Sequence, residues 1–132
     1  MKEFIAGPVV IGHSDQRRTI YDLIERGDAG GGRPLYNLAY FSPLRAGSAI
    51  GNHYHPEPMW ETYIILSGDG VMHFRDMDTN ERVKIPIGVG CLYRITVPPR
   101  MAHTLVAKTK MVLLIAATDA SVAENMIKAD VL

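Results

Sequence analysis

Cysteine, net charge and long apolar runs are all scarce in this sequence. Cys91 is the only cysteine, so no intrachain disulfide is possible and a reducing compartment is expected. Lysine plus arginine and aspartate plus glutamate both number 14, so the formal net charge is zero. This balance argues against a nucleic-acid or membrane-surface partner, because no basic excess is present to meet phosphates.

The apolar segments also exclude a membrane span. The longest aliphatic run, Met111–Ala117, is far too short to cross a bilayer. The first residues, Met1–Phe4, lack the charged-then-apolar layout of a signal peptide. We therefore expect a cytoplasmic globular protein, with 132 residues folding as one domain around a core that needs no disulfide.

Short apolar runs separated by turn signals predict an all-β fold. Glycine, proline, asparagine or aspartate falls between successive runs, and regular spacing of this kind is typical of a sandwich or small barrel. We expect a barrel over residues 35–117, with strands at residues 35–41, 49–55, 61–66, 71–75, 81–85, 91–95, 104–107 and 110–117.

The segments on either side of this range have different patterns. Thr19–Glu25 suits either a strand or a short helix, and the glycine-rich stretch Gly27–Pro34 lacks the ending of a phosphate-binding loop, so it is interpreted as a flexible connection. Near the C-terminus, Ser121 and Glu124 have the spacing of a capping box. They predict one short helix over residues 122–129.

The strongest chemical signal is a set of three histidines and one glutamate. His53 and His55 lie two residues apart on a predicted strand, so their side chains share a face and can converge on one ion. Glu61 opens the next apolar strand, and His103 stands at the start of a later one. Together they form a complete mononuclear metal site with room left for water or substrate.

Glu57 is the rival carboxylate for this site. It has the same strand parity as the two histidines, but Pro56 and Pro58 flank it and disfavour a continuous strand. Glu61 is therefore the favoured ligand.

With strands and ligands in place, the sequence resembles the cupins, which are small jelly-roll barrels built as a double-stranded β-helix. Gly47, His53, His55, Glu61 and Gly68 follow the first cupin motif, with one residue more than usual between His55 and Glu61. Of the second motif, Pro98 and His103 are present, whereas Arg100 replaces a glycine and Ala107 an asparagine.

The residues around the histidines resemble those of a narrower group of cupins. Residues 51–76 resemble the C-terminal cupin domain of the bifunctional capsule enzymes that make UDP-N-acetyl-L-fucosamine and bind zinc. Residues 15–18 resemble the Asp-x-Arg-Gly opening of dTDP-sugar epimerases and ketoisomerases, with Arg18 in place of the glycine. The resemblance implies isomerisation or epimerisation next to a ketone of a nucleotide-linked sugar, in polysaccharide precursor synthesis. It also implies a homodimer.

Such chemistry assigns roles to further side chains. A divalent ion, zinc first and iron, manganese or nickel as alternatives, would polarise the carbonyl while a base removes the neighbouring proton. Tyr63 and His73 are the candidate proton carriers. The candidate substrate-binding residues are the arginines that could meet phosphates and the tyrosines that could line the pocket: Arg45, Arg94, Arg100, Tyr36 and Tyr40.

Two other functions fit the same residues. A cupin dioxygenase would use Fe(II) at the same ligands, with open positions for oxygen. A small-molecule-binding or sensor module would keep the ion and need no general base. Because one barrel hosts many chemistries, the fold by itself does not decide among them.

Overall fold

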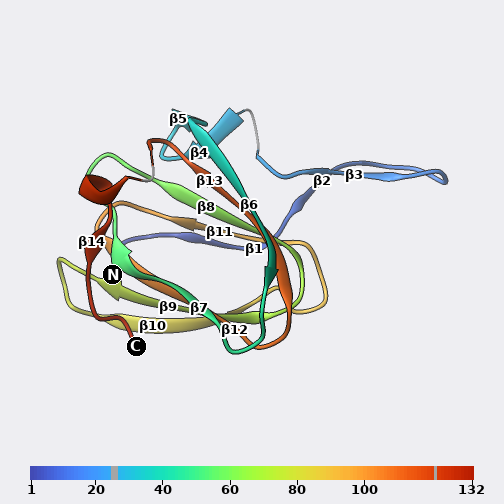
Figure 1. The fold of residues 1–132 in the computed structure, drawn as a ribbon. Helices are drawn as coiled ribbons and strands as arrows, with labels where there is room; N and C mark the ends of the chain where they lie inside the picture. The colour runs from blue at the N-terminus through green and yellow to red at the C-terminus, as the bar shows by residue number, and fades with distance from the viewer. Residues whose placement is uncertain (25–26, 121) are drawn as a thin grey trace.

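The computed structural model describes residues 1–24, 27–120 and 122–132. Two five-stranded antiparallel sheets face one another and enclose the core (Figure 1). The first sheet has the order β1-β11-β8-β13-β6, formed by β1 (Ile5–Pro8), β11 (Tyr93–Val97), β8 (Glu61–Ser67), β13 (Met111–Ala117) and β6 (Asn37–Leu44). The second has the order β10-β9-β12-β7-β14, formed by β10 (Arg82–Ile87), β9 (Gly70–Asp76), β12 (Met101–Ala107), β7 (Ala49–Tyr54) and β14 (Ile127–Lys128).

The core lies between the two sheets, on the inner face of each. Along β9, buried and half-buried residues alternate, so that Met72 and Phe74 face inward while His73 faces outward. This period of two is what a strand with one buried face requires. The central strand β8 is buried over most of its length because the core covers its inner face and residues 28–34 lie against its outer face, where Thr62 bonds to the Ala29 carbonyl. The all-β barrel expected from the sequence is confirmed.

Two small hairpins precede the barrel strands in the chain. β2 (Val10–Ser14) pairs with β3 (Thr19–Asp22) in a ribbon that projects away from the barrel (Figure 1). Thr19–Asp22 is therefore a strand, and Glu25, the last residue of the ambiguous stretch, lies outside the described residues. β4 (Asp28–Gly30) and β5 (Arg33–Pro34) form the second hairpin. The glycine-rich stretch is therefore a paired hairpin and not the flexible connection expected from the sequence.

The predicted C-terminal helix over residues 122–129 is wrong. A single 3₁₀ turn occupies Ala123–Asn125, and Ile127–Lys128 then continue as β14 along the edge of β7. Val122 stands at the cap position without a side-chain cap bond, and Ser121 lies outside the described residues. A helix this short is marginal in water, whereas the open edge of β7 offers hydrogen-bond partners to an extended segment.

Candidate metal and catalytic site

The four residues expected to form a metal site meet inside one end of the barrel. One ligand atom from each of His53, His55, Glu61 and His103 lies within 4.8 Å of the others. Glu61, by contrast with the exposed Glu57, is almost fully buried among the three imidazoles. The structure therefore places Glu61 in the cluster and leaves Glu57 outside it.

Backbone pairing explains how residues so far apart in the chain come together. His53 of β7 is the cross-strand partner of His103 of β12, and their ring centroids lie 4.9 Å apart. The register between these strands shifts next to His103, where Gly51 approaches with φ +115°. A Cβ at Gly51 would lie 2.5 Å from the His103 carbonyl oxygen. Only glycine allows this close approach.

Backbone carbonyls fix the orientation of two of the imidazoles. His103 Nδ1 lies 2.9 Å from the Met101 carbonyl oxygen, and His55 Nδ1 contacts the carbonyl oxygen of Asn125. A carbonyl only accepts hydrogen bonds, so the proton of each neutral ring sits on Nδ1. The Nε2 lone pair of each ring is then directed inward, toward Glu61.

This arrangement brings together several groups that carry lone pairs. His55 Nε2 lies 2.7 Å and His103 Nε2 3.2 Å from Glu61 Oε1, and His103 Nε2 is buried without a hydrogen-bond partner among the described residues. Lone pairs facing a carboxylate repel unless a proton or a cation lies between them. The donor set therefore fits a divalent ion, with the outer ring nitrogens held by carbonyls as is usual for metal-bound histidines.

The environment sets the protonation of each group when only protons are available. Burial, together with the charges of His103 and His55, lowers the pKa of His53 to about 4. Burial by itself would raise the pKa of Glu61, but contacts with His103 and His55 lower it to about 2. For His55, burial opposes the charged form, yet the hydrogen bond and charge of Glu61 raise its pKa. His53 is thus a neutral imidazole beside an ionised carboxylate.

The two candidate proton carriers lie in different places. Tyr63 is buried on the inner face of β8, with its ring 5.8 Å from that of His103. Burial and the nearby charge of Glu61 raise the pKa of its hydroxyl well above the ordinary value, so Tyr63 keeps its proton. His73 lies on the outer face of β9, where the structure does not bring it to the cluster.

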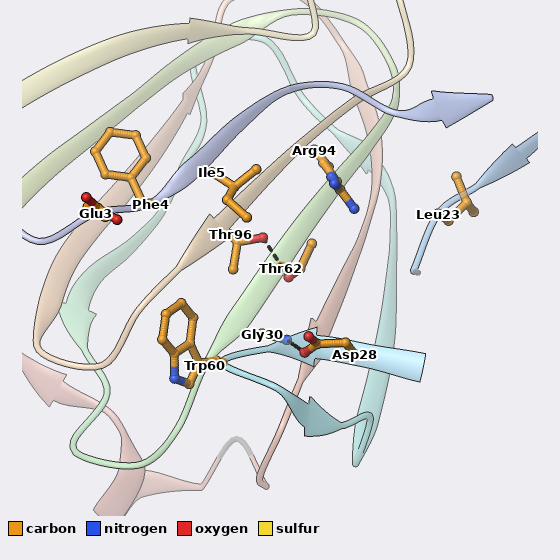
Figure 2. A pocket seen from close by; sticks show the side chains of 11 residues that line it. Glu3, Phe4, Ile5, Leu23, Asp28, Gly30, Trp60, Thr62, Arg94 and Thr96 are labelled. Atoms are coloured by element: carbon orange, nitrogen blue, oxygen red, sulfur yellow. Dashed lines mark hydrogen bonds between the residues drawn. The ribbon is translucent and has the colours of Figure 1, made fainter. Parts of the chain in front are cut away.

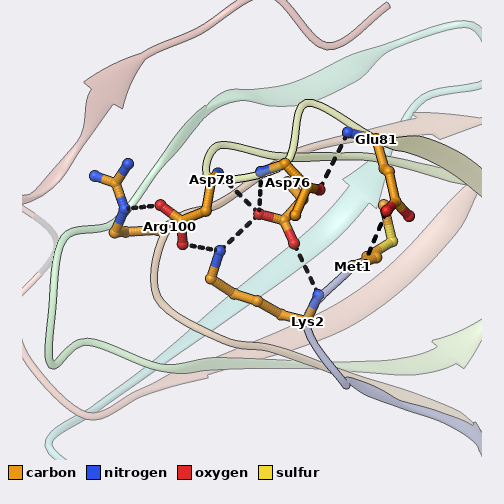
Figure 3. A network of polar contacts seen from close by, with 7 residues as sticks. Met1, Lys2, Asp76, Asp78, Glu81 and Arg100 are labelled. Carbon is orange, nitrogen blue, oxygen red and sulfur yellow. Dashed lines mark hydrogen bonds and ion pairs between the residues drawn. The ribbon is translucent and has the colours of Figure 1, made fainter.

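Of the candidate substrate-binding residues, only Arg100 lies beside the cluster. Its backbone N–H donates to the His55 carbonyl, and its guanidinium lies over the Tyr54 ring. The guanidinium also donates to Asp78 at 2.8 Å (Figure 3). Arg94 lies on the outer face of β11, and Arg45 lies in the exposed turn at the opposite end of β7. Tyr36 and Tyr40 are exposed on the outer side of β6.

The carbonyl of Asn125 is the part of the site that sequence reasoning missed. It lies on the C-terminal segment, which the sequence assigned to a helix, and it reaches His55 across 70 positions of the chain. A backbone carbonyl carries no signature in the residue type. The pairing of Ile127 with Tyr54 brings this segment over the cluster.

Comparison with known sequences identifies the family. The family described as "Polysaccharide biosynthesis C-terminal domain" matches residues 13–125. The chain belongs to this family. No curated protein matches the sequence of this family member. Membership of the polysaccharide biosynthesis C-terminal domain family is consistent with the resemblance seen in the histidine motif.

Several solved structures share the fold of this family member. The 3,4-ketoisomerase QdtA from Thermoanaerobacterium thermosaccharolyticum, solved as a point mutant in complex with TDP-4-keto-6-deoxyglucose, has a TM-score of 0.78 at 15% identity, over 97% of this chain and 88% of that one. The TDP-quinovose 3,4-ketoisomerase WlaRB from Campylobacter jejuni has a TM-score of 0.78 at 16% identity, over 97% and 94%. These similarities confirm the cupin jelly roll.

A larger protein also matches. The capsular polysaccharide assembling protein CapF from Staphylococcus aureus has a TM-score of 0.63 at 20% identity, over 94% of this chain and 35% of CapF. The chain thus spans about a third of the length of CapF.

Among the described residues of this family member, no helix has the length and apolar character needed to cross a membrane.

Proposed function

We propose that the chain is an isomerase or epimerase that moves a proton next to the ketone of a nucleotide-linked sugar. The observation that carries the proposal is the enclosed cluster of three histidines and Glu61, with one ligand atom from each within 4.8 Å of the others. Membership of a polysaccharide biosynthesis family and the likeness to ketoisomerase folds support the substrate class.

Within this proposal, His53, His55, Glu61 and His103 hold one divalent ion, with zinc the first choice. When bound, such an ion polarises a carbonyl oxygen and favours loss of the neighbouring proton. In this proposal Tyr63 acts as a proton donor and not as an acceptor, because burial and the charge of Glu61 keep its hydroxyl protonated. Arg100, whose backbone N–H bonds to the His55 carbonyl, would meet the diphosphate, since a guanidinium matches phosphate oxygens.

A second mechanism for the same reaction needs no ion. His53 is neutral because its pKa is lowered to about 4, and it is the least buried of the four residues. A neutral imidazole with access to substrate has a lone pair free to accept a proton, and its lowered pKa makes it a weaker base than an ordinary imidazole. In this mechanism His55 and Glu61 form an ion pair that holds the site in shape.

One exchange experiment tests the function and separates the two mechanisms. The protein is incubated in D₂O with TDP-4-keto-6-deoxyglucose, and NMR follows loss of the protons next to the ketone. We expect exchange that is lost in His53→Ala and kept in His73→Asn, whose side chain lies on the outer face of β9. Loss of exchange on chelation supports the ion, and its persistence supports His53 as the base. Absence of exchange with this and other keto-sugar nucleotides would contradict the proposal.

We further propose a homodimer in which a second copy covers exposed apolar side chains. Tyr36, Leu38 and Tyr40 are 68%, 50% and 64% exposed along the edge strand β6 and the residues that lead into it. Ile11 and Tyr21 are likewise exposed on the β2–β3 ribbon, and a lone two-stranded ribbon is only marginally stable in water. Contact between copies would bury these side chains and protect the edge.

A further inference from the structure

A cavity lies against the outer face of the first sheet (Figure 2), and none of the cluster histidines lines it. Its volume is about 670 Å³. Thr62 follows Glu61 on β8, so its side chain points to the opposite face of the strand, into this cavity. The other lining residues include Glu3 and Ile5 near the start of the chain, Arg94 and Thr96 of β11, Asp28 of β4, and Trp60, which directly precedes β8.

Trp60 is a rigid aromatic wall of this cavity. Its backbone N–H donates to Thr118 Oγ1 at 2.9 Å, and its carbonyl accepts from the Thr118 N–H at 3.0 Å. The indole packs on Gly30 and Gly31, where an added Cβ would lie 2.7 Å and 2.3 Å from atoms of the Trp60 side chain. A flat side chain held this firmly offers apolar area to a ligand without a large entropy cost on binding.

The two threonines on the floor leave an acceptor facing the cavity. Thr62 Oγ1 donates its single hydrogen to the Ala29 carbonyl oxygen at 2.9 Å. Thr62 and Thr96 hydroxyl oxygens lie 3.2 Å apart, and a hydroxyl has only one hydrogen, so Thr96 is the donor in that pair. The remaining lone pairs of Thr96 Oγ1 can accept a hydrogen bond from a ligand.

The charged groups that line the cavity also favour a neutral ligand. Among the described residues that line the cavity, Glu3 and Asp28 contribute carboxylates and Arg94 contributes a guanidinium, so two acidic groups are present beside one basic group. Asp28 Oδ1 already accepts the Gly30 N–H at 2.8 Å, which fixes its side chain. A phosphate or carboxylate ligand would meet repulsion here. A neutral ligand rich in hydroxyl donors would meet complementary groups.

We propose that this cavity binds a neutral sugar ring, at a site distinct from the barrel interior. A pyranose has an apolar face of C–H groups that suits the indole of Trp60, and hydroxyls that donate to Asp28, Glu3 and Thr96. An aromatic wall with a few convergent polar groups is typical of small-molecule sites. The site is independent of the proposed reaction, because the β8 backbone separates it from Glu61.

Tryptophan fluorescence tests the proposal directly, since Trp60 is the only tryptophan of the chain. The full-length protein is titrated with methyl glycosides of glucose, galactose, N-acetylglucosamine and fucose, up to the solubility limit of each. We expect a saturable change in emission with at least one of them. Chelator-treated protein should give the same curve, because the histidine cluster takes no part.

Two variants separate a binding role from a structural one. Thr96→Val keeps the side-chain shape and leaves the Thr62 bond to Ala29 intact, and we expect it to weaken sugar binding about fivefold. Asp28→Asn keeps an oxygen for the Gly30 N–H while removing the charge, and we expect about tenfold weaker binding. Thr79→Val, in the exposed turn between β9 and β10, is the matched control and should bind like the parent.

Three results would overturn the proposal. The first is the absence of any saturable change with all four glycosides in a protein whose circular dichroism and melting are normal. The second is an equal response from inorganic phosphate, which would identify an anion site. The third is an emission change that depends on protein concentration without sugar, which would identify the cavity as a contact between copies.

Discussion

Replacing Asp76 by asparagine should strongly destabilise the fold, because this buried carboxylate holds the N-terminal segment to the barrel. Asp76 is fully buried and accepts the Lys2 backbone N–H and the Lys2 ammonium, each at 2.7 Å (Figure 3). It also accepts the Asp78 N–H at 2.9 Å within the β9–β10 turn. Arg100, whose N–H bonds to His55, is bonded through its carbonyl to the same turn.

The expected loss of unfolding free energy follows from the hydrogen bonds that Asp76 would no longer accept as a charged group. Hydrogen bonds to a charged group contribute about 1.5–3 kcal/mol each, and removing one partner of a buried pair costs about 3–5 kcal/mol. We therefore expect Asp76→Asn to lose about 3 kcal/mol of unfolding free energy. For a chain of this size that loss lowers Tm by roughly 10 °C. Urea denaturation and calorimetry at neutral pH measure both quantities.

The effect has a defined pH dependence. Burial opposes ionisation of Asp76, but hydrogen bonds from Lys2 outweigh it and hold its pKa below the ordinary carboxyl value. A lowered pKa gives stability that is complete above the unfolded-state value, about pH 4, and is lost as pH falls through the folded-state value. The difference between parent and variant should therefore be constant near neutral pH and shrink in strong acid.

Asp78→Asn is the matched control for this prediction. Asp78 also pairs with Lys2 and Arg100, but its side chain is 48% exposed, so solvent screens both pairs and the loss should be much smaller. Equal stability of Asp76→Asn and the parent at neutral pH would refute the reasoning. So would a stability difference that persists unchanged in strong acid.

Three further predictions concern the cluster and the edge. Mass spectrometry of metal-loaded protein should find one zinc per chain, and this zinc should be absent in His55→Ala. Chelation should lower Tm. A chain that takes up no metal would contradict the metal site and support the mechanism that needs no ion. Gly51→Ala should reduce metal content and stability together, because its Cβ would lie 2.5 Å from the His103 carbonyl oxygen at φ +115°. Leu38→Arg should convert a dimer into a monomer in light-scattering chromatography at unchanged fold, and a parent that is already monomeric would contradict the dimer.

The barrel and its cluster could be predicted because each rests on a short-range pattern. Alternating apolar residues mark the strands, and the two-residue spacing of His53 and His55 places them on one face. The inward direction of Tyr63 follows from its parity with Glu61. The outward direction of His73 follows from the same alternation, because Met72 and Phe74 on either side of it face the core.

Features that depend on distant pairing were harder to predict. Residues 122–129 have helical spacing, but the open edge of β7 captures them as a strand, a choice that only the assembled sheet determines. Arg94 on β11 and Tyr40 on β6 are residue types that suit substrate binding, but each occupies a strand position whose side chain faces out of the barrel. No sequence motif marks the residues that line the outer cavity. The cytoplasmic location stays a prediction.

The contact between His55 and the Asn125 carbonyl also makes the C-terminal segment a support of the histidine cluster. The two residues are separated by 70 positions, and the segment that carries Asn125 pairs with β7. A cut in the chain between β13 and Asn125 should therefore leave the paired strands of His53 and His103 in place while His55 loses the carbonyl that orients it.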